Sequence, residues 1–167
     1  MSSTTIRPAA ASDAAAVARI YNEGIADRLA TFETRPRSPD EVAAWLDSGL
    51  PFLVAERGGD VVAWARVGPY SDRCVYDGVG EHGVYVAREA RGGGLGRRLL
   101  EALCAAAAAQ GFYKLTSRVF TDNGPSRAVH LAAGFEEVGI QRRHGRLDGR
   151  WKDCVLVERL LGDAATG

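Results

Sequence analysis

The sequence has few cysteines and no long apolar run, and both shortages restrict the class of protein it can be. Its 167 residues include three cysteines, an odd number at wide spacing that fits neither a disulfide framework nor a zinc site. No apolar run approaches the roughly 20 residues of a membrane-spanning helix. The opening stretch MSSTTIRPAAASDAAA lacks the basic segment and apolar core of a signal peptide. We therefore expect a cytoplasmic protein with reduced thiols, no metal and no membrane partner.

A surplus of positive charge is also absent. Lysine and arginine together number 21, as do aspartate and glutamate, so the formal net charge is zero. A protein that binds nucleic acid through bulk charge needs a basic surplus, so no nucleic-acid partner is expected. Hydrophobic residues make up 46% and charged residues 25% of the chain, which is ordinary for a globular protein. The length suits one domain with its own core, so residues 1–167 are predicted to form a single domain.

Periodicity and turn residues divide the chain into alternating strands and helices. The pattern predicts strands at 4–8, 51–56, 61–67, 84–86, 113–120, 135–143 and 152–161. It predicts helices at 13–25, 38–49, 94–110 and 123–134. Helices between the strands of the middle, with hairpins at both ends, indicate a mixed α/β sheet.

Capping residues and loops complete this outline. Ser12 is expected to cap the first helix, and Ser38 is expected to cap the second in a capping box with Glu41. Residues 68–83 form a loop that is long for a compact domain, which is typical of functional loops. Residues 144–151, HGRLDGRW, are predicted to be the loop of the last hairpin.

The most informative stretch is VYVAREARGGGLGRRLL, residues 84–100. Its consecutive glycines, 92–94, join a predicted strand to a predicted helix, with Arg91 before them and Arg97 and Arg98 after. Bare N–H groups at a helix N-terminus attract anions, and glycine lets a phosphate approach closely. We interpret the turn as a phosphate site, in particular for a pyrophosphate; the alternative is a tight turn with arginines in solvent. The endings required by a P-loop and by the dinucleotide fingerprint are both missing.

The remaining pattern, Arg-x-x-Gly-x-Gly at Arg91, Gly94 and Gly96, resembles the acetyl-CoA motif of the GNAT superfamily of acetyltransferases. Downstream, NGPSRAVHLAAGF is similar to that family's next helix, with Asn123 and Ser126 at its start. The resemblance implies one GNAT-type α/β domain of mixed α+β character. Its central mixed sheet, mostly antiparallel, would be flanked by helices and would have splayed central strands.

The same resemblance implies acetyl-CoA as the co-substrate, without a metal. The strand residues Val84, Tyr85 and Val86 would pair with the pantetheine arm. The residues that would hold the rest of the cofactor are Arg91, Gly92, Gly93, Gly94, Leu95, Gly96, Arg97, Asn123 and Ser126.

A narrower resemblance is to phosphinothricin N-acetyltransferases and the related arsinothricin and methionine sulfoximine enzymes. It is carried by IYN at 20–22, TFET at 31–34, GPY at 68–70 and VYDGVGE at 75–81. It implies that Glu81 is the general base and His130 a catalytic histidine. The chemistry needs such a base, because an amine is mostly protonated at neutral pH and must lose a proton before it attacks a thioester. From the residues alone, Glu81 could equally be a solvated carboxylate, and His130 could serve packing.

The branch also implies the substrate, the α-amine of a small acidic amino-acid analogue, and a homodimer whose last hairpin lies near the partner's active site. The residues expected to contact the substrate are Phe32, Arg66, Arg73 and Tyr76, since arginine holds acidic oxygens with two hydrogen bonds. Two positions depart from the branch: Arg66 replaces a neutral residue, and Leu147 replaces a basic one. A GNAT enzyme for another amine, such as a protein N-terminus or a polyamine-like drug, and a non-catalytic CoA-binding sensor are the alternatives.

Overall fold

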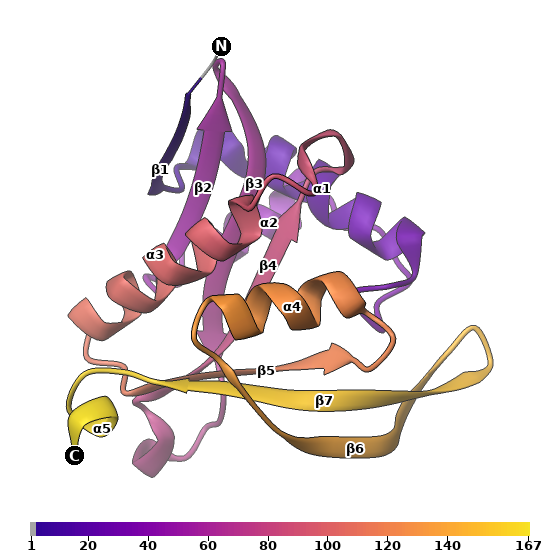
Figure 1. Ribbon diagram of the computed structural model, residues 1–167. Coiled ribbons are helices and arrows are strands. Elements are labelled where there is room, and N and C mark those ends of the chain that lie inside the picture. The colour runs from indigo at the N-terminus through magenta and orange to yellow at the C-terminus, as the bar shows by residue number, and fades with distance from the viewer. Residues whose placement is uncertain (1–2) are drawn as a thin grey trace.

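A seven-stranded sheet forms the centre of the molecule, with the strand order β1-β2-β3-β4-β5-β7-β6 (Figure 1). The computed structural model describes residues 3–167. The strands are β1 Thr4–Pro8, β2 Phe52–Arg57, β3 Asp60–Pro69, β4 Val79–Val86, β5 Lys114–Phe120, β6 Glu136–Leu147 and β7 Arg150–Leu160. All neighbouring strands are antiparallel except β4 and β5, which are parallel. The predicted mixed, mostly antiparallel sheet is confirmed.

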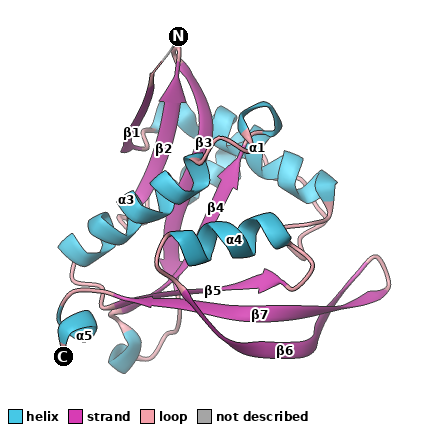
Figure 2. Cartoon of the chain, in the orientation of Figure 1, coloured by secondary structure: helices cyan, strands magenta, loops and turns pink. Residues whose placement is uncertain are grey.

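Helices cover both faces of this sheet (Figure 2). They are α1 Ala14–Asp27, α2 Pro39–Leu46, α3 Leu95–Ala109, α4 Gly124–Ala132 and the short α5 Asp163–Thr166. Trp64 packs with α1 and α2, whereas its neighbours Ala63 and Ala65 pack with α3. This alternation follows from the two-residue period of a strand, and it divides the core into two layers. No helix within residues 3–167 is long and apolar enough to cross a membrane.

The central strands β4 and β5 separate after a short contact. β4 pairs with β3 from Gly80 to Val86, but it pairs with β5 only from Val79 to Glu81. Beyond Glu81 the edge of β4 that faces β5 has no ladder. The predicted splay between central strands is therefore confirmed.

Several sequence expectations were wrong in detail. Ser12 does not cap α1: it lies in a 3₁₀ turn, and the N-cap of α1 is Asp13, whose carboxylate accepts from the N–H of Ala10 at 2.7 Å. Ser38 caps α2 as predicted, accepting from the N–H of Glu41 at 3.2 Å. The Glu41 carboxylate, however, pairs with Arg35 at 2.9 Å instead of completing a capping box.

Both predicted long loops are shorter than expected. Residues 68–69 belong to β3 and residues 79–83 to β4, so the connecting loop spans only 70–78. Residues 144–151 are mostly strand: β6 and β7 continue to a turn at Asp148 and Gly149, which have φ of 51° and 78°. Two successive residues with positive φ form the tight turn that fits the twist of a hairpin. The hairpin thereby extends past the end of β5 as an arm (Figure 1).

Candidate active site

A cleft of about 500 Å³ opens where β4 leaves β5. Its wall is built from β4, β5, the start of α4 and the chain between α1 and α2. The predicted site residues on this wall are Phe32, Glu81, Val84, Tyr85, Asn123, Ser126 and His130. The wall thus brings β4 residues together with residues of α4, whereas the predicted cofactor residues 91–97 do not line it.

The glycine turn leads into α3 with free backbone donors. Gly92 and Gly94 have φ of 85° and 79°, and a Cβ on either would meet no atom within 4 Å. The first backbone bond of the helix runs from the N–H of Arg98 to Gly94 O, at 3.3 Å. N–H groups before that bond have no intrahelical acceptor. Since glycine makes these positive φ angles possible and leaves the space beside them empty, the turn can hold an anion such as a phosphate.

The other glycine of the motif has a different role. A Cβ at Gly96 would lie 3.3 Å from Val129 Cγ1 on α4. Such a distance is tighter than most real contacts, so Gly96 permits the close approach of α3 and α4. Leu95 is buried in the core beneath the turn, whereas Gly93 is exposed.

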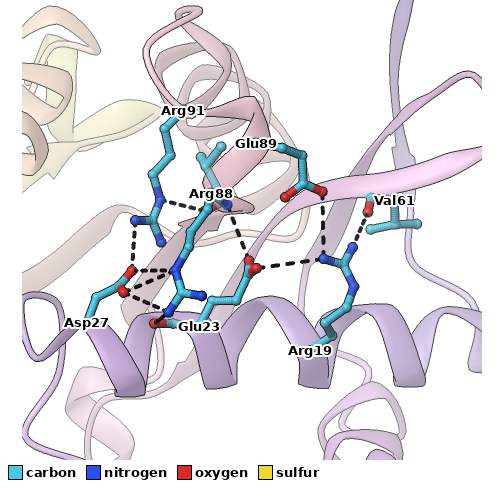
Figure 3. Close-up of polar contacts among 8 residues, drawn as sticks. Arg19, Glu23, Asp27, Val61, Arg88, Glu89 and Arg91 are labelled. Carbon is cyan, nitrogen blue, oxygen red and sulfur yellow. Dashed lines mark hydrogen bonds and ion pairs between the residues drawn. The ribbon is translucent and has the colours of Figure 1, made fainter.

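Arginines beside the turn are tied to α1 (Figure 3). The Arg91 guanidinium donates to Val86 O at 3.1 Å and pairs with Asp27 at 2.8 Å. Arg88 pairs with the same carboxylate at 2.7 Å. The hydrogen bonds from Arg88 and then Arg91 hold the pKa of Asp27 below its usual value. Arg91 thus fastens the turn to the end of α1, whereas Arg97 forms an exposed pair with Glu101.

Glu81 lies exposed on β4, in the wall of the cleft. It stands opposite Gly68 of β3, which has no side chain to cover it. No basic side chain within residues 3–167 forms an ion pair with Glu81. Its carboxylate is therefore free to accept a proton from a molecule in the cleft.

His130 is buried on α4 and forms a pair with His82, a residue that the sequence analysis missed. His130 Nδ1 lies 2.8 Å from Ser126 O, and a carbonyl only accepts, so Nδ1 carries the proton. His130 Nε2 is therefore an acceptor, and His82 donates to it from Nε2 at 2.9 Å. Burial lowers the pKa of His130 and, together with the neighbouring His130, lowers that of His82 to about 3. Both rings are neutral near neutral pH.

A second cleft, of about 300 Å³, adjoins the first on the side of α1 and α2. Arg66 lines it, and the Arg66 guanidinium carbon lies 4.3 Å from the ring centre of Trp45. Burial lowers the pKa of this guanidinium. The residues shared by both clefts are Glu81, His82, Gly83 and Tyr85. The two spaces therefore meet at Glu81.

The remaining predicted substrate residues lie apart from both clefts. Arg73 and Tyr76 are exposed in the loop 70–78, with the guanidinium carbon 5.6 Å from the ring centre. Neither residue belongs to the wall of either cleft. Leu147, which the sequence resemblance marked as a departure, is buried with Phe120 and Cys154, and Phe32 packs against this small apolar cluster. No group of three or more potential metal ligands occurs in the part of the chain that the structure describes.

Comparisons with known proteins agree on one family. Residues 18–135 match the model of the acetyltransferase (GNAT) family. The chain is 35% identical to the phosphinothricin N-acetyltransferase of Alcaligenes faecalis, over 97% of this chain and 85% of the relative. It is 33% identical to the L-methionine sulfoximine/L-methionine sulfone acetyltransferase of Pseudomonas aeruginosa, over 93% and 94%.

A solved structure shows the same fold with a bound cofactor. The GNAT superfamily phosphinothricin acetyltransferase of Sinorhizobium meliloti, in complex with AcCoA, superimposes with a TM-score of 0.91. The two chains are 32% identical, and the similarity covers 98% of this chain and 91% of the other.

Proposed function

Since the chain belongs to the GNAT family of acetyltransferases, we propose that its substrate is the α-amine of a small acidic amino-acid analogue, acetylated at the expense of acetyl-CoA. The observation that carries this proposal is the cleft of about 500 Å³, whose wall includes Glu81. The substrate class is supported by two relatives, which are named as a phosphinothricin N-acetyltransferase and an L-methionine sulfoximine/L-methionine sulfone acetyltransferase. Acetylation of the amine would detoxify such a compound.

Three of the predicted segments would contact the cofactor: the turn that leads into α3, the edge of β4 and the start of α4. The N–H groups of the turn 92–97 would hold the pyrophosphate, with Arg91 keeping the turn on α1. The open edge of β4 at Val84–Val86 would pair with the pantetheine arm. Asn123 caps α4 by accepting from the N–H of Ser126 at 3.2 Å, so both residues shape the opposite wall.

The chemical step needs a base at the amine and an electrophilic thioester. Glu81 takes a proton from the substrate ammonium, and the freed nitrogen attacks the thioester carbonyl carbon. The carbon–sulfur bond breaks, the acetyl group passes to nitrogen and CoA leaves as the thiolate. The nitrogen loses its second proton as the amide forms, and the thiolate gains that proton. His130 turns its only free lone pair toward His82, so we propose that it works as a relay within this pair and not as an independent acid.

We also propose that Arg73 and Tyr76 bind the acidic head group of the substrate. They lie in the loop that follows Gly68 and Pro69, which line the second cleft. Truncating Arg73 should then raise KM for phosphinothricin more than KM for a neutral amino acid.

A homodimer is also part of the proposal. Large apolar side chains stand exposed on the β6–β7 hairpin. Trp151, on the arm, is 49% exposed, and Val138 and Ile140, on the part of β6 beside the main sheet, are 54% and 58% exposed. Apolar and aromatic side chains of this kind are enriched in subunit contacts. The cysteines are free in the structure, and a cytoplasmic location with reduced thiols remains our expectation.

One assay tests the proposed function. The purified protein is mixed with acetyl-CoA and a panel of amines, and the release of free thiol is followed. The rate of thiol release from acetyl-CoA should be much higher with phosphinothricin, arsinothricin or methionine sulfoximine than with a polyamine or a peptide that has a free N-terminus. Faster turnover of the polyamine or the peptide would assign the enzyme to another amine. Binding of acetyl-CoA without any turnover would favour a sensor.

A further inference from the structure

Arg66 is a partly buried cation without a carboxylate partner among residues 3–167. Four aromatic side chains line the second cleft with it: Tyr21, Trp45, Trp64 and Tyr85. Stacking on Trp45 stabilises a guanidinium, but an aromatic wall does not replace the hydrogen bonds that water would supply. Burying a charge is costly unless it is paired. The site therefore favours a ligand that brings an anion.

The strand register places this cation beside Glu81. Arg66 stands opposite Gly83 and Gly68 stands opposite Glu81, on adjacent same-face positions of β3 and β4. Directly opposite residues point to the same face of a sheet, and diagonal neighbours are about 7–8 Å apart. Arg66 and Glu81 are such a diagonal pair. A cation and an anion thus lie side by side, each facing a glycine on the other strand.

The two glycines leave a shallow space between these charges. A Cβ at Gly68 would lie 3.7 Å from an Arg66 guanidinium nitrogen and 3.7 Å from Glu81 O. At Gly83 the nearest atom to a Cβ would be on the Tyr85 ring, at 3.5 Å. These are ordinary contact distances, so the glycines are not required by packing here. An atom placed beside Gly68 would touch the Arg66 guanidinium and the backbone carbonyl of Glu81, so a ligand group there would contact both residues.

We propose that Arg66 binds the α-carboxylate of a free amino acid whose α-ammonium group lies at Glu81. The inference rests on the proposed function, because Glu81 is the base of that reaction. An α-amino acid carries a carboxylate and an ammonium group on the same carbon. The diagonal pair Arg66 and Glu81 offers a cation to the carboxylate and an anion to the ammonium group. The guanidinium fork matches a carboxylate with two hydrogen bonds. Arg66 thereby selects free α-amino acids over protein N-termini and simple amines, whereas Arg73 and Tyr76 read the side-chain head group.

A pair of substrates that differ only in the α-carboxylate tests this assignment. They are phosphinothricin and its decarboxylated analogue, 3-aminopropyl(methyl)phosphinic acid, which keeps the amine and the head group. The wild type should prefer phosphinothricin strongly. Arg66→Gln should lower kcat/KM for phosphinothricin by roughly 30-fold or more, mainly through KM, and should leave the analogue unchanged. Arg57→Gln is the matched control, since Arg57 on β2 bonds Thr4 Oγ1 at 3.0 Å and lines neither cleft.

Gly68→Ala is a second variant that keeps the guanidinium. The added methyl fits without a clash, so the unfolding temperature should hardly change. KM for phosphinothricin should rise, because the methyl lies against the Arg66 guanidinium that would bind the carboxylate. Equal kcat/KM for both substrates in the wild type would overturn the assignment, as would equal losses for both in Arg66→Gln. If no amine releases thiol, the proposed function fails by itself. Calorimetry of phosphinothricin then decides: weaker binding to Arg66→Gln supports the inference, and equal binding overturns it.

Discussion

His82 and His130 share one proton between Nε2 atoms that lie 2.9 Å apart. His130 carries its own ring proton on Nδ1, which donates to the carbonyl of Ser126. The remaining ring nitrogen, His82 Nδ1, is buried and has no hydrogen-bond partner among residues 3–167. An additional proton on either ring would place positive charge on a buried side chain. The pair therefore stays neutral, and its neutrality is linked to folding.

His82→Gln tests this linkage through the pH dependence of stability. An unfolded histidine titrates near pH 6.5, whereas folded His82 titrates at about 3. As pH falls below about 6.5 the unfolded chain binds the proton first, so the unfolding free energy decreases, by roughly 1 kcal/mol per pH unit for one such group. Above about pH 6.5 His82 is neutral in both the folded and the unfolded chain, so this loss of unfolding free energy is absent. Glutamine keeps a donor to His130 but does not titrate.

Urea unfolding at about pH 7.5 and about pH 5 measures the effect. The wild type should lose more stability between these conditions than His82→Gln does. Identical losses would show that folding does not lower the pKa of His82.

Glu81→Gln should separate binding from catalysis. The amide keeps the shape of the side chain but cannot take the ammonium proton, and general-base catalysis is typically worth about 10²–10⁴-fold. We expect kcat to fall by that order while the dissociation constant for acetyl-CoA is unchanged. A pH–rate profile with the same acidic limb in wild type and variant would exclude Glu81 as the base.

Gly94→Val should abolish tight binding of acetyl-CoA. Gly94 has φ of 79° and faces open space, so valine there adds both backbone strain and a branched side chain at the anion site. Gly49 has φ of 76°, also with no atom within 4 Å of a Cβ, and it lines neither cleft. Gly49→Val is therefore the matched control for strain alone. Calorimetry should show weakened binding only in Gly94→Val; tight binding in that variant would refute the phosphate site.

Trp151→Glu should disrupt a dimer that uses the arm. Trp151 is 49% exposed and stacks on Arg146, whose guanidinium carbon lies 4.2 Å from the indole ring centre. A carboxylate in an apolar contact would be desolvated at a large cost. Sedimentation should show a wild-type dimer at micromolar concentration and a monomeric variant, whereas Leu160→Glu, also exposed but at the other end of β7, should remain dimeric. A monomeric wild type would contradict the proposal.

Local signals in the sequence were sufficient for much of this fold. Ser38 caps its helix because a hydroxyl satisfies a free N–H wherever the chain enters a helix. The glycines 92–94 marked a strand-to-helix turn because their conformational freedom belongs to the residue itself. Such features depend on a few neighbours in the chain, so they can be predicted without tertiary contacts.

Other features depend on packing between distant segments. The beginning of β4 was interpreted as loop because glycine disfavours strands, yet a Cβ at Gly80 would lie 2.4 Å from Val67 Cγ1. That glycine is therefore required by the neighbouring strand. Because residues 79–83 were predicted as part of the loop 68–83, the alternation that turns Glu81 outward and buries His82 was missed. Residues 144–151 were correctly predicted to connect a hairpin, but the loop was predicted too long, since the turn consists only of Asp148 and Gly149.

The open edge of β4 has a consequence for the protein without its cofactor. From His82 to Tyr85 the backbone groups that face β5 have no ladder, so their amide hydrogens should exchange with solvent long before those of β3. If the cofactor supplies the missing partner, it acts as an added strand, and amide exchange at this edge should slow when acetyl-CoA binds. A ligand present at about 100 times its dissociation constant adds about 2.7 kcal/mol to the unfolding free energy. The cell's acetyl-CoA level would then set how long this enzyme resists unfolding and proteolysis.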